Sequence, residues 1–166
     1  MNGEDRSVEI ADVDDVETAG HADGEGARHA VARGRVTMQA ETVASVSANT
    51  LKKGDVLATA RYAAVQAAKQ TSSLVAGADP VTMTDVTIRF VVGETWIDIE
   101  ARVECVDRVD IEAHALSAVT IAALTVYDMC KSADRTMMIG AVELFETSGG
   151  RRGAWRRGEN DRDTEI

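Results

Sequence analysis

The sequence predicts an α+β fold in which helices pack on one face of an antiparallel sheet. Two runs of alternating apolar and polar residues, at 84–92 and 95–106, are joined at Gly93 and Glu94, which is typical of a β-hairpin. One long apolar stretch, at 112–131, has the spacing of a helix. Because two of the strands form a direct hairpin, the helices cannot cover both faces of the sheet through regular crossovers.

The stretch at 112–131 is the segment around which the chain is organised. Val119, Ala122, Ala123 and Val126 recur at helical spacing, and little of this helix is left to face water. We therefore expect it to be the core helix of the domain. Ionisable groups stand at both ends of this helix. They are either helix caps and ion pairs or parts of a functional site. They are Glu112 and His114 in the first turn, and Asp128 and Lys131 in the last.

The remaining elements follow from shorter patterns. Asp55 is placed to cap the N-terminus of the longer of two early helices. Pro80, the only proline, marks the loop that follows this helix. In chain order we expect a possible short strand at 8–13, a strand at 33–39, helices at 41–49 and 56–75, a loop at 77–81, the hairpin, the core helix and a last strand at 138–147.

Length and charge divide the chain into one domain and two tails. The 166 residues suffice for a single domain with a proper core, and 45% of them are apolar. The net charge of −10 is concentrated at the ends, since residues 1–27 hold nine acidic residues against Arg6 alone. We expect an acidic, mostly disordered N-terminal tail at 1–27, a single α+β domain at 28–150 and a flexible C-terminal tail at 151–166.

Cysteine usage and hydropathy indicate the cellular setting. Cys105 and Cys130 make no disulfide framework, lack metal-site spacing and are expected in the core. We expect no apolar run of membrane-spanning length and no signal peptide, which predicts a cytoplasmic protein without a membrane partner. The basic segment Arg151–Arg157 could close over phosphates, contact nucleic acid weakly or remain a solvated tail. A nucleic-acid partner is not expected.

Three strings in the chain resemble one family. They are KKGDVLATARYAAVQAAKQT at 52–71, IEAHALSAVTIAALTVYDMCK at 111–131 and MIGAVELFETSGG at 138–150. At these spacings they resemble the cyclic pyranopterin monophosphate synthases of molybdenum cofactor biosynthesis. The resemblance runs from about Arg28 to Gly153, which is most of the chain.

The resemblance implies a ferredoxin-like α+β fold and a lyase reaction. The substrate would be a cyclic dihydroguanosine triphosphate, a small molecule derived from a purine triphosphate. The reaction rearranges it to cyclic pyranopterin monophosphate and releases diphosphate. The resemblance implies no metal and no organic cofactor. Members of this family assemble as homo-hexamers, each a trimer of dimers, with the active site at the dimer interface.

The resemblance also implies which side chains form the site. Lys53 in KGD, and Asp128 and Lys131 in YDMCK, match catalytic residues of the family. The two lysines would serve as acid, base and electrostatic groups, and Asp128 would orient or tune Lys131. Lysine does acid or base work near neutral pH only if burial or neighbouring cations lower its pKa. Glu112 matches the first glutamate of an acidic pair, which we expect to bind substrate.

The chain departs from the family pattern at several site positions. Asp79, after Ala78, replaces the histidine of a Cys-His-Pro loop, and His114, after Ala113, replaces the second glutamate of the acidic pair. Thr147 replaces a lysine before Ser-Gly-Gly. These changes make the site less favourable for a triphosphate, which needs cations to offset its charge. Because imidazole and carboxylate have changed places, we hypothesise that Asp79 and His114 bind substrate as an exchanged pair.

Each assignment has a simpler alternative. Asp128 and Lys131 could form an ordinary ion pair, and Lys53 could be a solvated loop lysine. Glu112 could complement the dipole of the helix N-terminus. His114 could be hydrogen-bonded within the core or solvated, and Asp79 could be an ordinary turn residue. For the whole chain, the alternative to the enzyme is a non-catalytic family member. Such a protein would keep the fold and the oligomer and bind a different ligand or a sister subunit.

Overall fold

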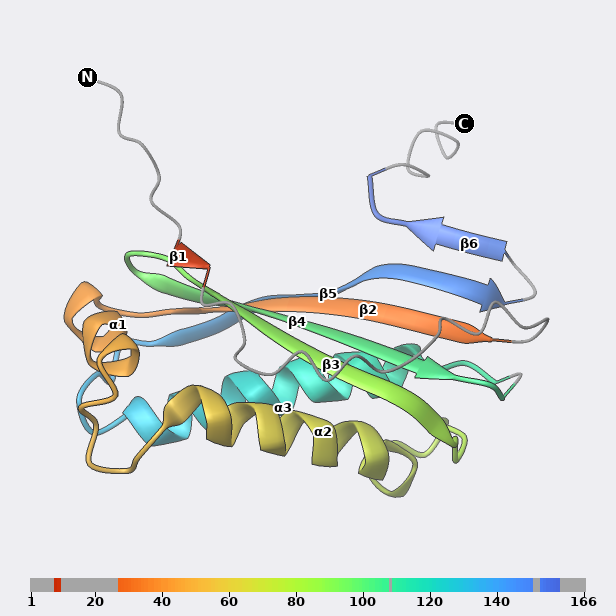
Figure 1. The fold of residues 1–166 in the computed structure, drawn as a ribbon, viewed down its shortest axis with the longest axis horizontal. Helices are drawn as coiled ribbons and strands as arrows, with labels where there is room; N and C mark the ends of the chain where they lie inside the picture. The colour runs from red at the N-terminus through yellow and green to blue at the C-terminus, as the bar shows by residue number, and fades with distance from the viewer. Residues whose placement is uncertain (1–7, 10–26, 108, 151–152, 159–166) are drawn as a thin grey trace.

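The computed structural model describes residues 8–9, 27–107, 109–150 and 153–158. Six strands lie in the order β1-β3-β4-β2-β5-β6 with antiparallel neighbours throughout, and the long helices α2 and α3 lie along one face of this sheet (Figure 1). The predicted α+β fold is confirmed. The elements are β1 (Val8–Glu9), β2 (Arg28–Thr37), α1 (Ala40–Ser47), α2 (Val56–Leu74), β3 (Met83–Val92), β4 (Trp96–Cys105), α3 (Glu112–Cys130), β5 (Met138–Gly150) and β6 (Gly153–Arg156).

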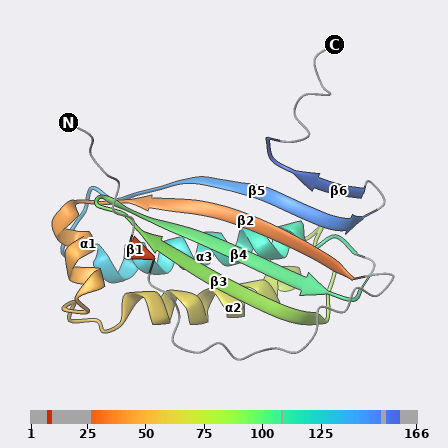
Figure 2. The same cartoon turned by 45° about the horizontal axis from the view of Figure 1, so that its top comes forward.

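The centre of the sheet is built by the predicted hairpin and by β2. Strands β3 and β4 pair along their length, and β2 lies between β4 and β5 (Figure 2). Every second residue of β4, from Ile97 to Cys105, is buried, while the residues between them are partly exposed. This is the period of a strand with one covered face. The opposite face of the sheet is not covered by a helix among the described residues.

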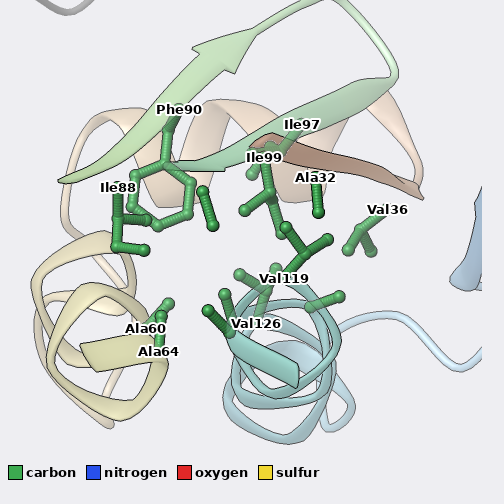
Figure 3. Packing of buried hydrophobic residues seen from close by; sticks show 14 of the residues in the cluster. Ala32, Val36, Ala60, Ala64, Ile88, Phe90, Ile97, Ile99, Val119 and Val126 are labelled. Atoms are coloured by element: carbon green, nitrogen blue, oxygen red, sulfur yellow. The ribbon is translucent and has the colours of Figure 1, made fainter. Parts of the chain in front are cut away.

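The hydrophobic core lies between the sheet and the helices α2 and α3 (Figure 3). Gly34 on β2 permits close packing against α3, because a Cβ at this position would lie only 2.6 Å from a methyl group of Val119. The helices contribute mainly small residues, so they can approach the sheet and each other closely. The core residues labelled in Figure 3 are Ala32, Val36, Ala60, Ala64, Ile88, Phe90, Ile97, Ile99, Val119 and Val126.

Helix α3 is the core helix that the sequence predicts. It contacts α2, β2, β4 and β5, and nine of its residues are buried. By length and composition alone it is long and apolar enough to cross a membrane, so the expectation that no stretch reaches that length is wrong. Half of this apolar stretch of α3 is buried against the rest of the domain. Cys105 and Cys130 are both buried in the core, as predicted.

Helix α2 begins where the sequence places its cap. The Asp55 carboxylate accepts a hydrogen bond of 3.0 Å from the backbone N–H of Ala58. This satisfies one of the donors that every helix N-terminus leaves free, and such caps contribute on the order of 1 kcal/mol. The predicted helix at 56–75 is confirmed as Val56–Leu74.

The structure extends the predicted sheet at both of its edges. Val8–Glu9 pairs with β3, and the rest of the possible strand at 8–13 lies outside the described residues. Strand β2 begins five residues earlier than predicted, at Arg28. Strand β6 lies within the predicted flexible C-terminal tail and pairs with β5, and the sequence does not predict this strand. A four-residue edge strand with the sequence Gly-Ala-Trp-Arg has no local pattern that reveals it.

Candidate functional site

Three of the predicted site residues meet at the C-terminal end of α3. Asp128 and Lys131 stand on its last turn, and the ammonium of Lys131 lies 2.6 Å from the Asp128 carboxylate. Lys53, in the loop before α2, donates a hydrogen bond of 2.9 Å to the backbone carbonyl of Asp128, and its ammonium lies 3.9 Å from the carboxylate. The structure therefore brings two cations to one carboxylate. All three side chains are about half exposed to solvent.

The charges of Asp128 and Lys131 hold each other ionised. The hydrogen bond and the charge of Lys131, followed by the charge of Lys53, lower the pKa of Asp128. In turn the hydrogen bond and charge of Asp128 raise the pKa of Lys131. This is the opposite of the shift that lysine needs for base catalysis near neutral pH. Within one chain, Lys131 is therefore a cation that can bind an anion or donate a proton.

A buried carboxylate that sequence reasoning missed fixes the loop behind this cluster. Asp134 is 2% exposed and accepts hydrogen bonds from the backbone N–H of Gln39 and the hydroxyl of Thr42, both near the start of α1. It also accepts hydrogen bonds from the backbone N–H and the hydroxyl of Thr136. Burial alone would raise the pKa of Asp134, but these hydrogen bonds lower it overall. They tie the chain just after Lys131 to another part of the domain.

Glu112 lies at the other end of α3, beside an arginine that sequence reasoning also missed. Glu112 is exposed and lines a shallow hollow together with Arg28, Asp110 and Thr147. The Arg28 guanidinium lies 3.6 Å from the Asp110 carboxylate. Its buried Nε has no hydrogen-bond partner among the described residues. Arg28 thus brings a partly unpartnered cation to the hollow that Thr147 also lines.

His114 and Asp79 also lie together, next to the start of α3. His114 is 1% exposed, and burial lowers its pKa, while a hydrogen bond to the backbone of Asp79 and the charge of Asp79 act in the opposite direction. The Nδ1 atom of His114 has no hydrogen-bond partner among the described residues. His114 is therefore neither solvated nor fully satisfied, and the loop residue and the helix residue are in electrostatic contact.

The predicted site residues thus form two groups at opposite ends of one helix. Lys53, Asp128 and Lys131 gather at the end of α3, and Glu112, with His114 and Asp79, gathers at its start. Helix α3 has 19 residues, which at 1.5 Å per residue separates its two ends by roughly 27 Å. One chain does not bring the two groups together.

Comparison with known proteins identifies the family of the chain. The chain matches the family model described as MoaC family over residues 20–150, which include every predicted site residue. The chain belongs to the MoaC family. The match spans the described residues from β2 to the end of β5, and it includes the loop of Asp79 and both ends of α3.

Curated relatives in the MoaC family share much of the sequence. A cyclic pyranopterin monophosphate synthase of Thermomicrobium roseum is 48% identical over 136 residues, which are 81% of this chain and 82% of that protein. The protein of the same name from Chloroflexus aurantiacus is 46% identical over 133 residues, 79% of this chain and 82% of that protein. That of Heliobacterium modesticaldum is 43% identical over 138 residues, 82% of this chain and 87% of that protein.

Proposed function

We propose that this chain is a cyclic pyranopterin monophosphate synthase, a lyase of molybdenum cofactor biosynthesis. It would convert a cyclic dihydroguanosine triphosphate to cyclic pyranopterin monophosphate and diphosphate. The observation that carries the proposal is the cluster of Lys53, Asp128 and Lys131, which lies inside the MoaC family match and has the contacts of an anion site. The relatives that carry this enzyme name support the same reaction.

The lysine cluster suits the phosphate end of such a substrate. Lys53 and Lys131 place two ammonium groups around Asp128, and both are accessible to a ligand. An incoming triphosphate would compete with Asp128 for these donors through charge-assisted hydrogen bonds. Because Asp128 keeps Lys131 protonated, we assign Lys131 the roles of charge stabiliser and proton donor. Lys53 is the second cation, and Asp128 orients both.

The other end of α3 suits the base of the substrate. A guanine-like ring presents adjacent N–H groups, and a carboxylate such as Glu112 can accept hydrogen bonds from both. Arg28 lies in the same hollow and adds a cation beside Thr147. The buried His114 lies near the loop residue Asp79, whose backbone and charge both act on the imidazole. We assign Glu112, Arg28, His114 and Asp79 to substrate binding.

A complete site then needs two chains. Because roughly 27 Å separate the two groups, we propose that the lysine cluster of one protomer faces Glu112 of a second copy. A two-fold axis would repeat this contact and create two equal sites in each dimer. The homo-hexamer expected from the family resemblance, a trimer of dimers, would hold six. A nucleotide-derived substrate also fits the proposed cytoplasmic location.

The proposal is tested by assaying the purified protein for pterin product and diphosphate, in buffers from low to high salt. We expect turnover of the cyclic dihydroguanosine triphosphate, and a loss of roughly a hundredfold or more in Lys53→Ala and Lys131→Ala, as when a group that stabilises transition-state charge is removed. Absence of turnover in a folded, oligomeric preparation would contradict the enzyme and favour a non-catalytic family member.

A further inference from the structure

A histidine outside the predicted site bridges two strands next to it. His29 on β2 lies directly across from Ser148 on β5. Its Nε2 lies 2.6 Å from the Glu146 carboxylate, and its Nδ1 lies 2.5 Å from the Ser148 hydroxyl. Both ring nitrogens are therefore used, and the side chains of His29 and Glu146 are only 20% and 26% exposed.

The two partners of this histidine flank a residue that lines the candidate site. Successive residues of a strand point to opposite faces of the sheet. Glu146 and Ser148 both reach His29, so Thr147 between them points the other way. Thr147 lines the hollow that contains Glu112 and Arg28, and His29 and Ser148 line the same hollow. Holding Glu146 and Ser148 on one face thus fixes Thr147 on the other.

A glycine that no other residue can easily replace lies at the end of β5, next to Ser148. Gly149 has a φ of +80°, in the left-handed region, and a Cβ at this position would lie 2.5 Å from the backbone oxygen of Ala27. It would also lie 3.0 Å from the side chain of Arg28. The end of β5 is therefore pressed against the start of β2 immediately beside the His29 contacts.

We propose that His29 is a positioning residue that clamps the end of β5 and so sets the substrate-binding hollow beside Glu112. This inference rests on the proposed function for its effect on substrate, but the clamp itself is a property of the fold. The carboxylate of Glu146 can only accept hydrogen bonds, so Nε2 of His29 carries a hydrogen and donates a hydrogen bond to it. In the neutral ring Nδ1 then accepts from the Ser148 hydroxyl. In the charged ring Nδ1 donates to the same oxygen, so the clamp holds in both states.

The surroundings of Glu146 allow the clamp to be tested without unfolding the sheet. Arg102 and Arg156 also face this carboxylate, at 3.9 and 3.4 Å, so Glu146 keeps cationic partners when the imidazole is removed. Removing the imidazole therefore affects Ser148 most, because its hydroxyl then has no side-chain partner on β2. The expected consequence is a looser segment at 147–150 in an otherwise folded protein.

The test compares His29→Ala with Arg35→Ala. Arg35 stands on the same strand and pairs with Asp98 by two hydrogen bonds on the sheet face without helices, so its removal is a matched control far from the hollow. In His29→Ala we expect a KM for the cyclic triphosphate that is roughly tenfold higher, corresponding to about 1.4 kcal/mol, with kcat changed less than about twofold. His29→Asn keeps an atom near the Nδ1 position and should recover part of this loss.

Hydrogen exchange separates the clamp from the enzyme proposal. Backbone amides at 147–150 should exchange faster in His29→Ala and remain unchanged in Arg35→Ala, whether or not the protein turns over substrate. Faster exchange in a protein without turnover would leave the clamp standing and remove the proposed function. Unchanged exchange at 147–150, or an equal rise of KM in Arg35→Ala, would overturn the assignment of His29.

Discussion

The Lys131 ammonium lies 2.6 Å from the Asp128 carboxylate, one turn apart at the end of the core helix. This pair has the geometry of an ordinary i, i+3 ion pair, and such exposed pairs contribute little to stability. What distinguishes it is Lys53, which reaches the same aspartate from a separate loop. Two lysines that converge on one exposed carboxylate form a surface prepared for an anion.

The first prediction concerns the pH dependence set by Asp128. Asp128 raises the pKa of Lys131, so Lys131 stays protonated to higher pH than an isolated lysine. In Asp128→Asn this support is lost, and the alkaline limb of the kcat/KM profile should move to lower pH. Asp98→Asn serves as the control, because it removes the partner of Arg35 on the sheet face without helices and should leave the alkaline limb in place. An alkaline limb that Asp128→Asn does not move would show that Lys131 is not the titrating acid.

The second prediction concerns the stability that Asp134 supplies. Its pKa is lowered in the folded state, so its contribution is present above its unfolded pKa, about 3.9, and is lost as the pH falls below that value. Asp134→Asn should lower the free energy of unfolding by about 2 kcal/mol at neutral pH, since buried hydrogen bonds to a charged acceptor are weakened. The difference from the unaltered protein should shrink at pH 3 in urea titrations.

A matched carboxylate controls for the loss of charge alone. Asp85 accepts a hydrogen bond from Thr87 on the partly exposed strand β3, and Asp85→Asn should change the free energy of unfolding by less than about 0.5 kcal/mol. If the two substitutions were equal in effect, the buried hydrogen bonds of Asp134 would not be the source of its stabilisation.

The third prediction concerns the exchanged pair of His114 and Asp79. His114→Glu alone puts a buried carboxylate beside Asp79, and Asp79→His alone puts an imidazole beside a buried imidazole. Each single change should lower kcat/KM roughly tenfold, because two carboxylates or two imidazoles then lie near each other. The double variant restores one acid and one imidazole and should recover most of the activity. A coupling energy near zero, instead of at least about 1 kcal/mol, would show that the two residues act separately.

The sequence predicts the elements that have strong local patterns and misses those that depend on pairing. The hairpin, the core helix and the Asp55 cap are each encoded by a few neighbouring residues, and the structure confirms them. Strand β6 forms only because β5 offers it an edge. Its sequence, with a glycine at its start, carries no such pattern by itself.

The candidate site shows the same division. Lys53, Asp128 and Lys131 stand out through the family resemblance, and their contact depends on the packing of the loop before α2 against the end of α3. Arg28 and His29 could not be recognised, because their roles come from the register of β2 with β5. A single arginine or histidine at the edge of a predicted tail has no signal of its own.

The central claim is that one catalytic site combines the lysine cluster of one chain with Glu112 of another. Subunit complementation tests it most directly, with Lys131→Ala and Glu112→Gln each purified and then mixed under conditions that exchange subunits. If sites are shared, random mixing leaves about one quarter of them with both residues intact, so activity should return to about a quarter of that of the unaltered protein. If mass spectrometry shows mixed oligomers and the activity stays at the level of the separate variants, the shared site is contradicted.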